Sequence, residues 1–207
     1  MAELLDPQGA FADRLARLPV APPEHELVVQ EAFYGLATVM ARAGQREALG
    51  PAFPDGPHRS DAYLGIGPGT WLAVGEGASP YWAAALGERL SGLASVVDQS
   101  SGYAVLRIGG AAARDLLSRG AFIDFHDFGS DRVAVTGIAH MGVILWRRGE
   151  VYEVAMFRSY AGSFWDWLLA TAAGMGVAPH TVIAAKAGIL SMSSQAEGLE
   201  GSQPSLG

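Results

Sequence analysis

The sequence contains no cysteine. This absence excludes disulfide bonds, thiolate nucleophiles and cysteine metal sites, and it suits a reducing compartment. Lysine is almost absent too, because Lys186 is the only lysine among 14 basic residues, which stand against 21 acidic ones. Only Arg147 and Arg148 are adjacent basic residues. Since a nucleic-acid-binding protein needs clustered cations to neutralise phosphates, we expect no nucleic-acid partner.

Long apolar runs are also missing. The longest nearly charge-free apolar stretch, residues 133–146, is interrupted by His140 and several glycines. It is shorter than the roughly 20 apolar residues that a membrane-spanning helix needs. Residues 1–6 carry acidic groups where a signal peptide has basic ones, and they lack its apolar core. We therefore expect a soluble, cytoplasmic protein without a membrane segment.

The residues that are present suffice for a folded core, because half of the 207 residues are apolar. We expect three parts: an N-terminal helix and linker at residues 1–23, an α+β domain at residues 24–177, and a C-terminal tail at residues 178–207. Within the tail, residues 191–207 contain no aromatic and no basic residue. Such a segment cannot offset its ordering entropy by burial, so the tail is predicted to be largely flexible.

The strongest pattern in the sequence lies between Val96 and Trp167. It predicts a strand that ends near Gly110, a helix at residues 111–119, apolar strands around residues 133–138, 143–146 and 151–157, and a helix that carries residues 164–169. The gaps between the three strands have hairpin length, so these strands should pair antiparallel. The sequence therefore predicts an α+β fold of antiparallel sheets with packed helices.

Weaker patterns place the remaining elements. We expect a helix from Asp6-Pro7 to about Arg17, strands at residues 27–29 and 34–40, a helical turn at residues 45–49, a helix capped by Ser79-Pro80 and running through Leu90, and a short strand at residues 181–183.

Two glycine-rich stretches resemble phosphate-binding loops. The first contains Gly65, Gly67 and Gly69, but residues 71–74 continue as a strand, whereas a phosphate loop leads into a helix. We therefore favour a hairpin there. The second, Gly109-Gly110, does lead from a strand into a helix but lacks the third glycine of a dinucleotide fingerprint. We favour glycines that allow the helix to pack closely on its strand.

Polar residues that could carry chemistry are few. The five histidines are far apart in the sequence. At a strand end, Asp124 and His126 would share one face and could hold a metal or act as a base with its orienting group, or they could stabilise a turn. Asp98 could bind a substrate amine or serve as a turn partner of Ser100 and Ser101. We predict no catalytic, cofactor-binding or metal-binding residue in this chain.

The last predicted helix carries large aromatic residues on two sides. Helical periodicity places Trp165, Leu168, Leu169 and Ala172 on a core-facing stripe. The opposite side carries Tyr160, Phe164, Trp167 and Thr171. Either the helix is sandwiched inside the domain, or the second side contacts another protein, since tryptophan and tyrosine are favoured in interfaces. Tyr160 and Trp167 are therefore possible partner-interface residues.

Four segments between residues 27 and 177 match a known family pattern. They are residues 64–72 (LGIGPGTWL), Asp98-Gln99-Ser100 with residues 105–117 (VLRIGGAAARDLL), residues 123–126 (IDFH) and residues 158–168 (RSYAGSFWDWL). Together they resemble the gamma subunit of heterotetrameric sarcosine oxidase, a small relative of the aminomethyltransferase folate-binding fold. The last segment is the most specific match. The chain departs from the family at Gly69-Thr70, where an acidic pair is usual.

The resemblance implies a role in a complex with alpha, beta and delta subunits. In such complexes the alpha subunit carries NAD and the tetrahydrofolate-binding region, the beta subunit binds FAD, FMN lies between the two, and the delta subunit holds zinc. The gamma subunit has the aminomethyltransferase-like fold and no known catalytic residue. The resemblance thus implies a structural subunit of an oxidoreductase of sarcosine catabolism and one-carbon metabolism.

Two alternatives stay open at this point. One is a stand-alone, folate-dependent aminomethyltransferase-like enzyme that uses Asp98 near a pocket. The other is a simple module that binds folate or an amine. The full transferases are much longer than this chain, which weighs against the first alternative.

Overall fold

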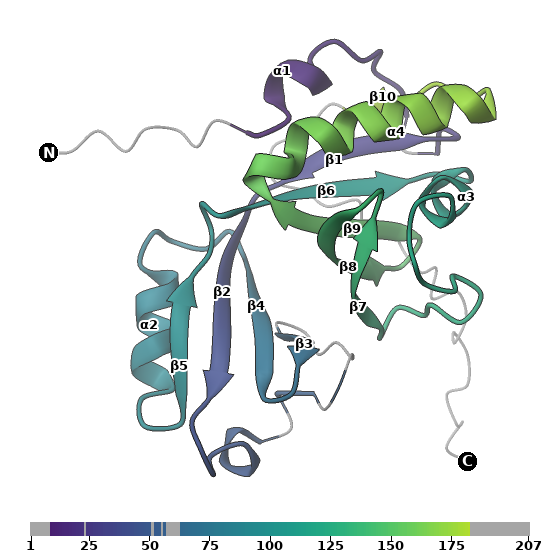
Figure 1. The fold of residues 1–207 in the computed structure, drawn as a ribbon. Coiled ribbons are helices and arrows are strands. Elements are labelled where there is room, and N and C mark those ends of the chain that lie inside the picture. The colour runs from purple at the N-terminus through teal and green to yellow at the C-terminus, as the bar shows by residue number, and fades with distance from the viewer. Residues whose placement is uncertain (1–8, 23, 51, 55, 57–62, 183–207) are drawn as a thin grey trace, which may run out of the picture.

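The computed structural model describes residues 9–22, 24–50, 52–54, 56 and 63–182. Their secondary structure forms two sheets, and helices cover the outer face of each (Figure 1). No described helix is long and apolar enough to cross a membrane. The last residue of the short strand predicted at residues 181–183 and the rest of the tail beyond it lie outside the described residues, as does the expected helix start at Asp6-Pro7.

The larger sheet has six strands in the order β10-β1-β6-β9-β8-β7. Their bounds are β1 Val28–Ala32, β6 Tyr103–Gly109, β7 Val133–Ile138, β8 Met141–Arg148, β9 Val151–Phe157 and β10 His180–Thr181. All neighbours pair antiparallel except β1 and β10, which are parallel. The antiparallel hairpins expected between residues 133 and 157 are thus confirmed.

The smaller sheet has four antiparallel strands in the order β3-β4-β2-β5. Its strands are β2 Tyr34–Ala41, β3 Tyr63–Gly67, β4 Thr70–Glu76 and β5 Ala94–Asp98, and the 3₁₀ turn η1 spans Glu47–Leu49. Phe33 alone separates β1 from β2, so the chain passes from one sheet to the other within one residue. The two sheets therefore meet at this crossing.

Three apolar clusters correspond to these layers. Between the larger sheet and the helices α3 (Ala113–Ser118) and α4 (Ala161–Met175) lies the largest cluster, which includes Leu106, Val154 and Leu168. A second cluster fills the space between the sheets, and a third lies between the smaller sheet and α2 (Trp82–Arg89). The alternation of side chains along β6 explains why its residues contribute to two different clusters. Leu106 and Ile108 face the helices, while Val105 faces the other sheet.

The first helix is much shorter than the predicted one. α1 spans only Ala12–Leu15, one helical turn, and residues 9–11 are not helical. The Glu31 carboxylate accepts hydrogen bonds from the backbone N–H groups of Ala10 (2.6 Å) and Phe11 (3.1 Å). These contacts fix the chain before α1 in a non-helical path. They also place Phe11, which is fully buried, in the same core as α4.

Two predictions about helix detail were wrong. Ser79-Pro80 does not cap α2, because the N-cap is Tyr81 and the helix begins at Trp82 without a side-chain cap. Leu169 does not belong to the buried stripe of α4, since 37% of it is exposed, while Phe164 from the opposite predicted side is fully buried. The buried stripe of α4 is therefore rotated toward Ala161 and Phe164. The division into three parts stays a prediction.

Candidate functional site

The first glycine-rich stretch is a hairpin, as predicted. β3 and β4 pair antiparallel on either side of a turn at Pro68-Gly69. The strand after the turn carries Trp71, whose indole Nε1 donates a hydrogen bond to the Pro54 carbonyl oxygen (2.8 Å). The phosphate-loop alternative required a helix at this position, and a strand occupies it instead.

The second glycine-rich stretch serves close packing. Gly110 has φ +94°, a conformation that L side chains rarely adopt, and a Cβ there would collide with the backbone oxygens of His25 and Glu26. The next turn is held to the same segment, because the Ala112 N–H donates to the Glu26 oxygen (2.9 Å). The glycine thus allows the start of α3 to lie against the chain that precedes β1.

Asp124 and His126 do not share a strand face, because residues 122–127 form no strand. Both side chains are exposed, and Asp124 Oδ1 accepts a hydrogen bond from the His126 backbone N–H (2.7 Å). This is the turn-stabilising arrangement that was the alternative to a metal or base site. Among the described residues, no group of three or more histidine and acidic side chains is placed to hold a metal ion.

Asp98 also acts as a turn partner, and it borders a hollow. Its Oδ1 accepts hydrogen bonds from the Ser100 backbone N–H (2.8 Å) and from Ser100 Oγ (2.7 Å). Ser100 Oγ in turn accepts a hydrogen bond from the Leu36 N–H (3.0 Å), which ties the turn to β2. The hollow has a volume of about 460 Å³. Its lining includes Phe33, Trp82, Ser101, Tyr103 and Arg158.

A buried ionic network joins the two sheets, and sequence reasoning missed it. Glu153 on β9 is 1% exposed. Its Oε1 accepts hydrogen bonds from Tyr34 Oη on β2 (2.7 Å) and from Arg107 Nε on β6 (3.0 Å). Arg107 Nη2 also donates to the Tyr34 hydroxyl oxygen. Arg148 on β8 lies 3.5 Å from Glu153 Oε2 through its Nε, and it pairs with the exposed Glu76 on β4.

The pKa values of two members of the network, Tyr34 and Arg107, are shifted. Burial raises the pKa of Tyr34 well above its usual range, and the charge and hydrogen bond of Glu153 raise it further. Burial alone would lower the pKa of Arg107, but its interactions with Tyr34 and Glu153 more than offset that effect and raise it. Both shifts favour a neutral tyrosine and a charged arginine at this site.

The sequence did hold a signal for this network. Arg107 and Glu153 occupy central positions of two apolar strands, on the faces that Val105 and Ala155 share between the sheets. Opposite charges in the middle of such strands indicate a buried ion pair. The pairing of Arg107 with Glu153 in the β6–β9 register brings them together.

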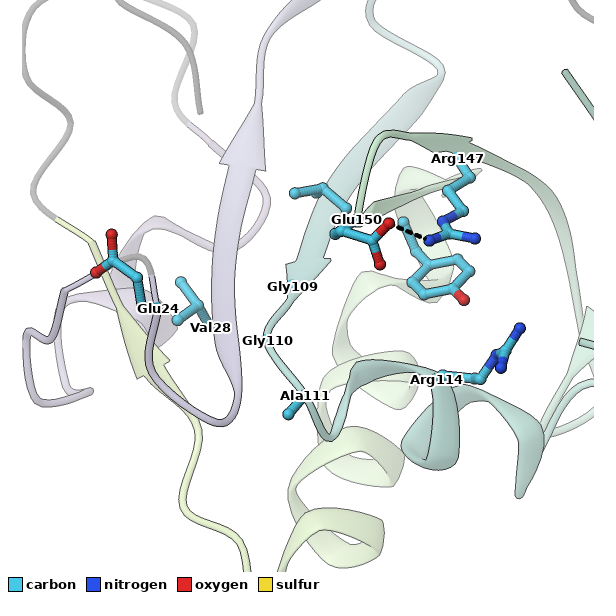
Figure 2. Close-up of a pocket in the computed structure, with 10 residues that line it drawn as sticks. Glu24, Val28, Gly109, Gly110, Ala111, Arg114, Arg147 and Glu150 are labelled. Carbon is cyan, nitrogen blue, oxygen red and sulfur yellow. Dashed lines mark ion pairs between the residues drawn. The ribbon is translucent and has the colours of Figure 1, made fainter. Parts of the chain in front are cut away.

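A second cavity of about 400 Å³ opens where β6 ends and α3 begins (Figure 2). Its lining contains two basic side chains, Arg114 from α3 and Arg147 from the end of β8. Val28, Val151 and the buried Tyr152 supply apolar surface; the remaining lining residues are Glu24, Gly109, Gly110, Ala111 and Glu150. Arg147 Nη2 pairs with the exposed Glu150 (2.6 Å), and its guanidinium lies over the Tyr152 ring.

The aromatic residues named as interface candidates lie in different surroundings. Trp167 is half-buried, and its indole covers Gly120, where a Cβ would overlap the ring. Tyr160 is 41% exposed. It continues a row in which Tyr103 stacks on Phe157 (4.9 Å between ring centroids) and Phe157 meets Tyr160 edge-on (6.3 Å). We call Tyr103, Phe157 and Tyr160 the aromatic row; it adjoins the Asp98 hollow through Tyr103.

Two of the separated histidines meet in the structure. The rings of His25 and His180 lie 3.8 Å apart between centroids, before β1 and at the start of β10. His180 Nδ1 is 2.9 Å from the Ala178 carbonyl oxygen. The parallel pairing of β1 with β10 brings them together, which no sequence spacing could show.

Comparison with known proteins gives consistent matches. The model of the family described as sarcosine oxidase, gamma subunit family, matches residues 59–174. A sarcosine oxidase subunit gamma from an Arthrobacter species is 33% identical over 130 residues, which are 56% of this chain and 63% of that protein. One from Corynebacterium sp. (strain P-1) is 34% identical over 119 residues, 52% of this chain and 57% of that protein. The match thus spans less than two thirds of the length of either relative.

Solved structures agree on the fold. A chain of the heterotetrameric sarcosine oxidase from Corynebacterium sp. U-96, in complex with pyrrole 2-carboxylate, is similar with a TM-score of 0.70 and 25% identity, covering 83% of this chain and 97% of that one. The glycine cleavage system aminomethyltransferase T from Bartonella henselae is similar with a TM-score of 0.57 and 14% identity, covering 85% of this chain and 51% of that one. The predicted aminomethyltransferase-like α+β fold is therefore confirmed.

Proposed function

Because the chain belongs to the sarcosine oxidase gamma subunit family, we propose that it is a non-catalytic, structural subunit of a flavin-dependent sarcosine oxidase complex. The complex oxidatively demethylates sarcosine to glycine. It passes the one-carbon unit to tetrahydrofolate or releases it as formaldehyde, and it reduces oxygen to hydrogen peroxide. We assign FAD, FMN, NAD, tetrahydrofolate and zinc to alpha, beta and delta subunits, and we place the complex in the cytoplasm.

One observation carries this proposal. The likeness to a chain of a heterotetrameric sarcosine oxidase extends over nearly the whole of that chain. The local chemistry supports the non-catalytic part. Asp98 and Asp124, the two acidic residues considered for a chemical role, are engaged in turns through short hydrogen bonds. A carboxylate that holds a turn in this way is explained by the fold.

The surface supports a role in assembly. The aromatic row and Phe33, which is 59% exposed, present apolar rings beside the Asp98 hollow. Aromatic residues are enriched in the buried centres of protein interfaces. We place a contact with a partner subunit at this surface and assign Tyr160 to it. We assign the exposed part of the Trp167 side chain to the interface as well.

The test compares the chain alone with the chain in its complex. The full chain, purified by itself, should show no visible flavin absorbance and no oxygen uptake with sarcosine. Expressed together with the alpha, beta and delta subunits, it should co-purify in a yellow complex that consumes oxygen. Bound flavin in the lone chain, or a complex that is equally stable and active without it, would overturn the proposal.

A titration separates this function from the alternatives. Micromolar binding of tetrahydrofolate to the lone chain would favour a folate-binding module or a transferase-like enzyme. A chain that has only a role in assembly should show no binding of tetrahydrofolate in this range. Asp98→Asn in the same titration distinguishes a ligand role for this carboxylate from its role in the turn.

A further inference from the structure

The cavity between β6, α3 and β8 is lined by two arginines, Arg114 and Arg147, and by two glutamates, of which Glu150 forms an ion pair with Arg147. Figure 2 shows Arg114 and Arg147 on the same side of this space, and Glu24 on the other. The two arginines come from separate elements, α3 and β8.

Arg147 has donors that its protein partners leave open. Its side chain is 17% exposed, yet its ion pair is with Glu150, whose side chain is 75% exposed. Its buried Nε has no hydrogen-bond partner among the described residues. This Nε is itself inaccessible, so an oxyanion in the cavity would bind Arg147 through its Nη groups, of which Nη2 pairs with Glu150. The two Nη groups carry four N–H donors, more than a single carboxylate partner uses.

Arg114 can contribute to the same ligand. Its Nη2 donates to the Phe125 carbonyl oxygen (2.8 Å), which fixes the direction of the side chain. A guanidinium has five N–H donors in a planar fork, so most of them remain after this bond. Fixed guanidinium groups recognise carboxylates and phosphates through paired, charge-assisted hydrogen bonds.

The rest of the lining defines the body of the ligand. Val28, Val151 and the ring of Tyr152 give the cavity an apolar wall, and about 400 Å³ is within the range of small-molecule sites. An inorganic anion would leave this wall without a contact. An oxyanion on a short apolar or aromatic body satisfies both the arginines and the wall.

We propose that this cavity, bounded by Arg114, Arg147, Val28 and Val151, binds a small organic oxyanion, a carboxylate or a phosphate ester with an apolar body. Arg147 and Arg114 hold the oxyanion, and the valines with Tyr152 contact the body. Glu150 competes with the ligand for Arg147, because it forms an ion pair with the same guanidinium. This site is separate from the Asp98 hollow and from the aromatic row.

The experiment titrates the full chain by calorimetry with benzoate and with phenyl phosphate, and with acetate and inorganic phosphate as probes without an apolar body. Saturable binding of an aromatic probe, at least several-fold tighter than its small counterpart, is expected because the ring gains the apolar wall. The tighter of the two aromatic probes then identifies carboxylate or phosphate as the preferred group. Absence of saturable binding of both would overturn the proposal.

Three substitutions locate the binding. Arg147→Gln and Arg114→Gln should each weaken it about tenfold or more, as loss of a charged hydrogen bond does. Glu150→Gln should tighten it by up to about fivefold, because an exposed competitor for Arg147 is removed. Arg132→Gln, an exposed arginine outside the lining, is the matched control and should leave it unchanged.

The gain in affinity is the sharpest outcome, because Glu150 is exposed and its substitution does not threaten folding. If the Arg147–Glu150 ion pair had only a structural role, Glu150→Gln would not bind the probe more tightly. If Arg147→Gln fails to fold, the exposed Arg114 and Glu150 positions still decide the matter. Equal affinities of all variants and the control would place the binding elsewhere and refute the proposal.

Discussion

Glu153→Gln tests whether the network between the sheets stabilises the fold. The substitution keeps the size of the side chain and removes its charge. Glu153 Oε1 accepts two hydrogen bonds, from Tyr34 and Arg107, and its Oε2 lies 3.5 Å from Arg148. The neutral amide leaves two partly buried arginines with Glu76 as their remaining counter-charge in this network.

The expected loss follows from these contacts. Removing one partner of a buried ion pair costs about 3–5 kcal/mol, because the other charge is left uncompensated. The side chains of Arg107 and Arg148 are 21% and 31% exposed, so water screens part of this cost. We therefore expect a fall of about 3 kcal/mol in the free energy of unfolding, at the lower end of that range.

Urea unfolding of the full chain, followed by circular dichroism, measures this loss. The matched control is Glu76→Gln, which removes a carboxylate from the same network at a site that is 52% exposed. An exposed ion pair contributes at most about 1 kcal/mol, so this control should change little. Equal losses below that value in both variants would refute the view that Glu153 is the buried centre of the network.

Trp165→Ala should lower the free energy of unfolding by about 3–5 kcal/mol, as large core truncations do, because this side chain is 4% exposed. Trp167→Ala should cost much less in the lone chain yet weaken co-purification with the partner subunits, and equal falls in melting temperature would contradict this difference. Gly110→Ala should destabilise the chain by at least about 1–3 kcal/mol in thermal unfolding, because of its φ of +94°, whereas Gly142→Ala, with open space around it, should be nearly neutral. Burial raises the pKa of Tyr34 in the folded state, so Tyr34 ionises at lower pH in the unfolded chain than in the folded one. The stability that this shift contributes is fully present below about pH 10 and decreases as the pH rises further. Tyr34→Phe should lose less free energy of unfolding over that range, and identical slopes of stability against pH in the two proteins would refute the assignment.

The sequence predicted the elements whose signals are local. The three strands between residues 133 and 157, the hairpin around Pro68 and the long last helix were each expected from periodicity and turn residues, and each is present. The polar turn partners were foreseen for the same reason. Asp98 with Ser100 and Asp124 with His126 are two residues apart, so their hydrogen bonds depend on the local chain alone.

Element boundaries and helix faces were predicted less well, because tertiary contacts set them. Glu31 holds the backbone of Ala10 and Phe11, and thereby shortens α1 from a distance of 20 residues or more in the sequence. On α4, the buried stripe includes Phe164 in place of Leu169. The periodicity gave the helix but not its rotation, since aromatic residues occupy both sides and either side could have faced the core.

The charges in the middle of two apolar strands indicated burial around Glu153, but no local pattern shows which residues pair there. Tyr34 and Glu153 are 119 residues apart, and Arg107 is 73 residues from Tyr34. Burying such groups gains little net stability over apolar residues of the same size, because desolvation opposes the attraction. We infer that the network contributes to specificity, because Tyr34 and Glu153 can bond only when the two sheets meet in one relative position. A chain with apolar residues at all these positions could still form both sheets, but nothing polar would fix how the sheets pack. The chain crosses between the sheets at Phe33, which lines the hollow beside the aromatic row. The relative position of the two sheets therefore also sets the shape of this hollow.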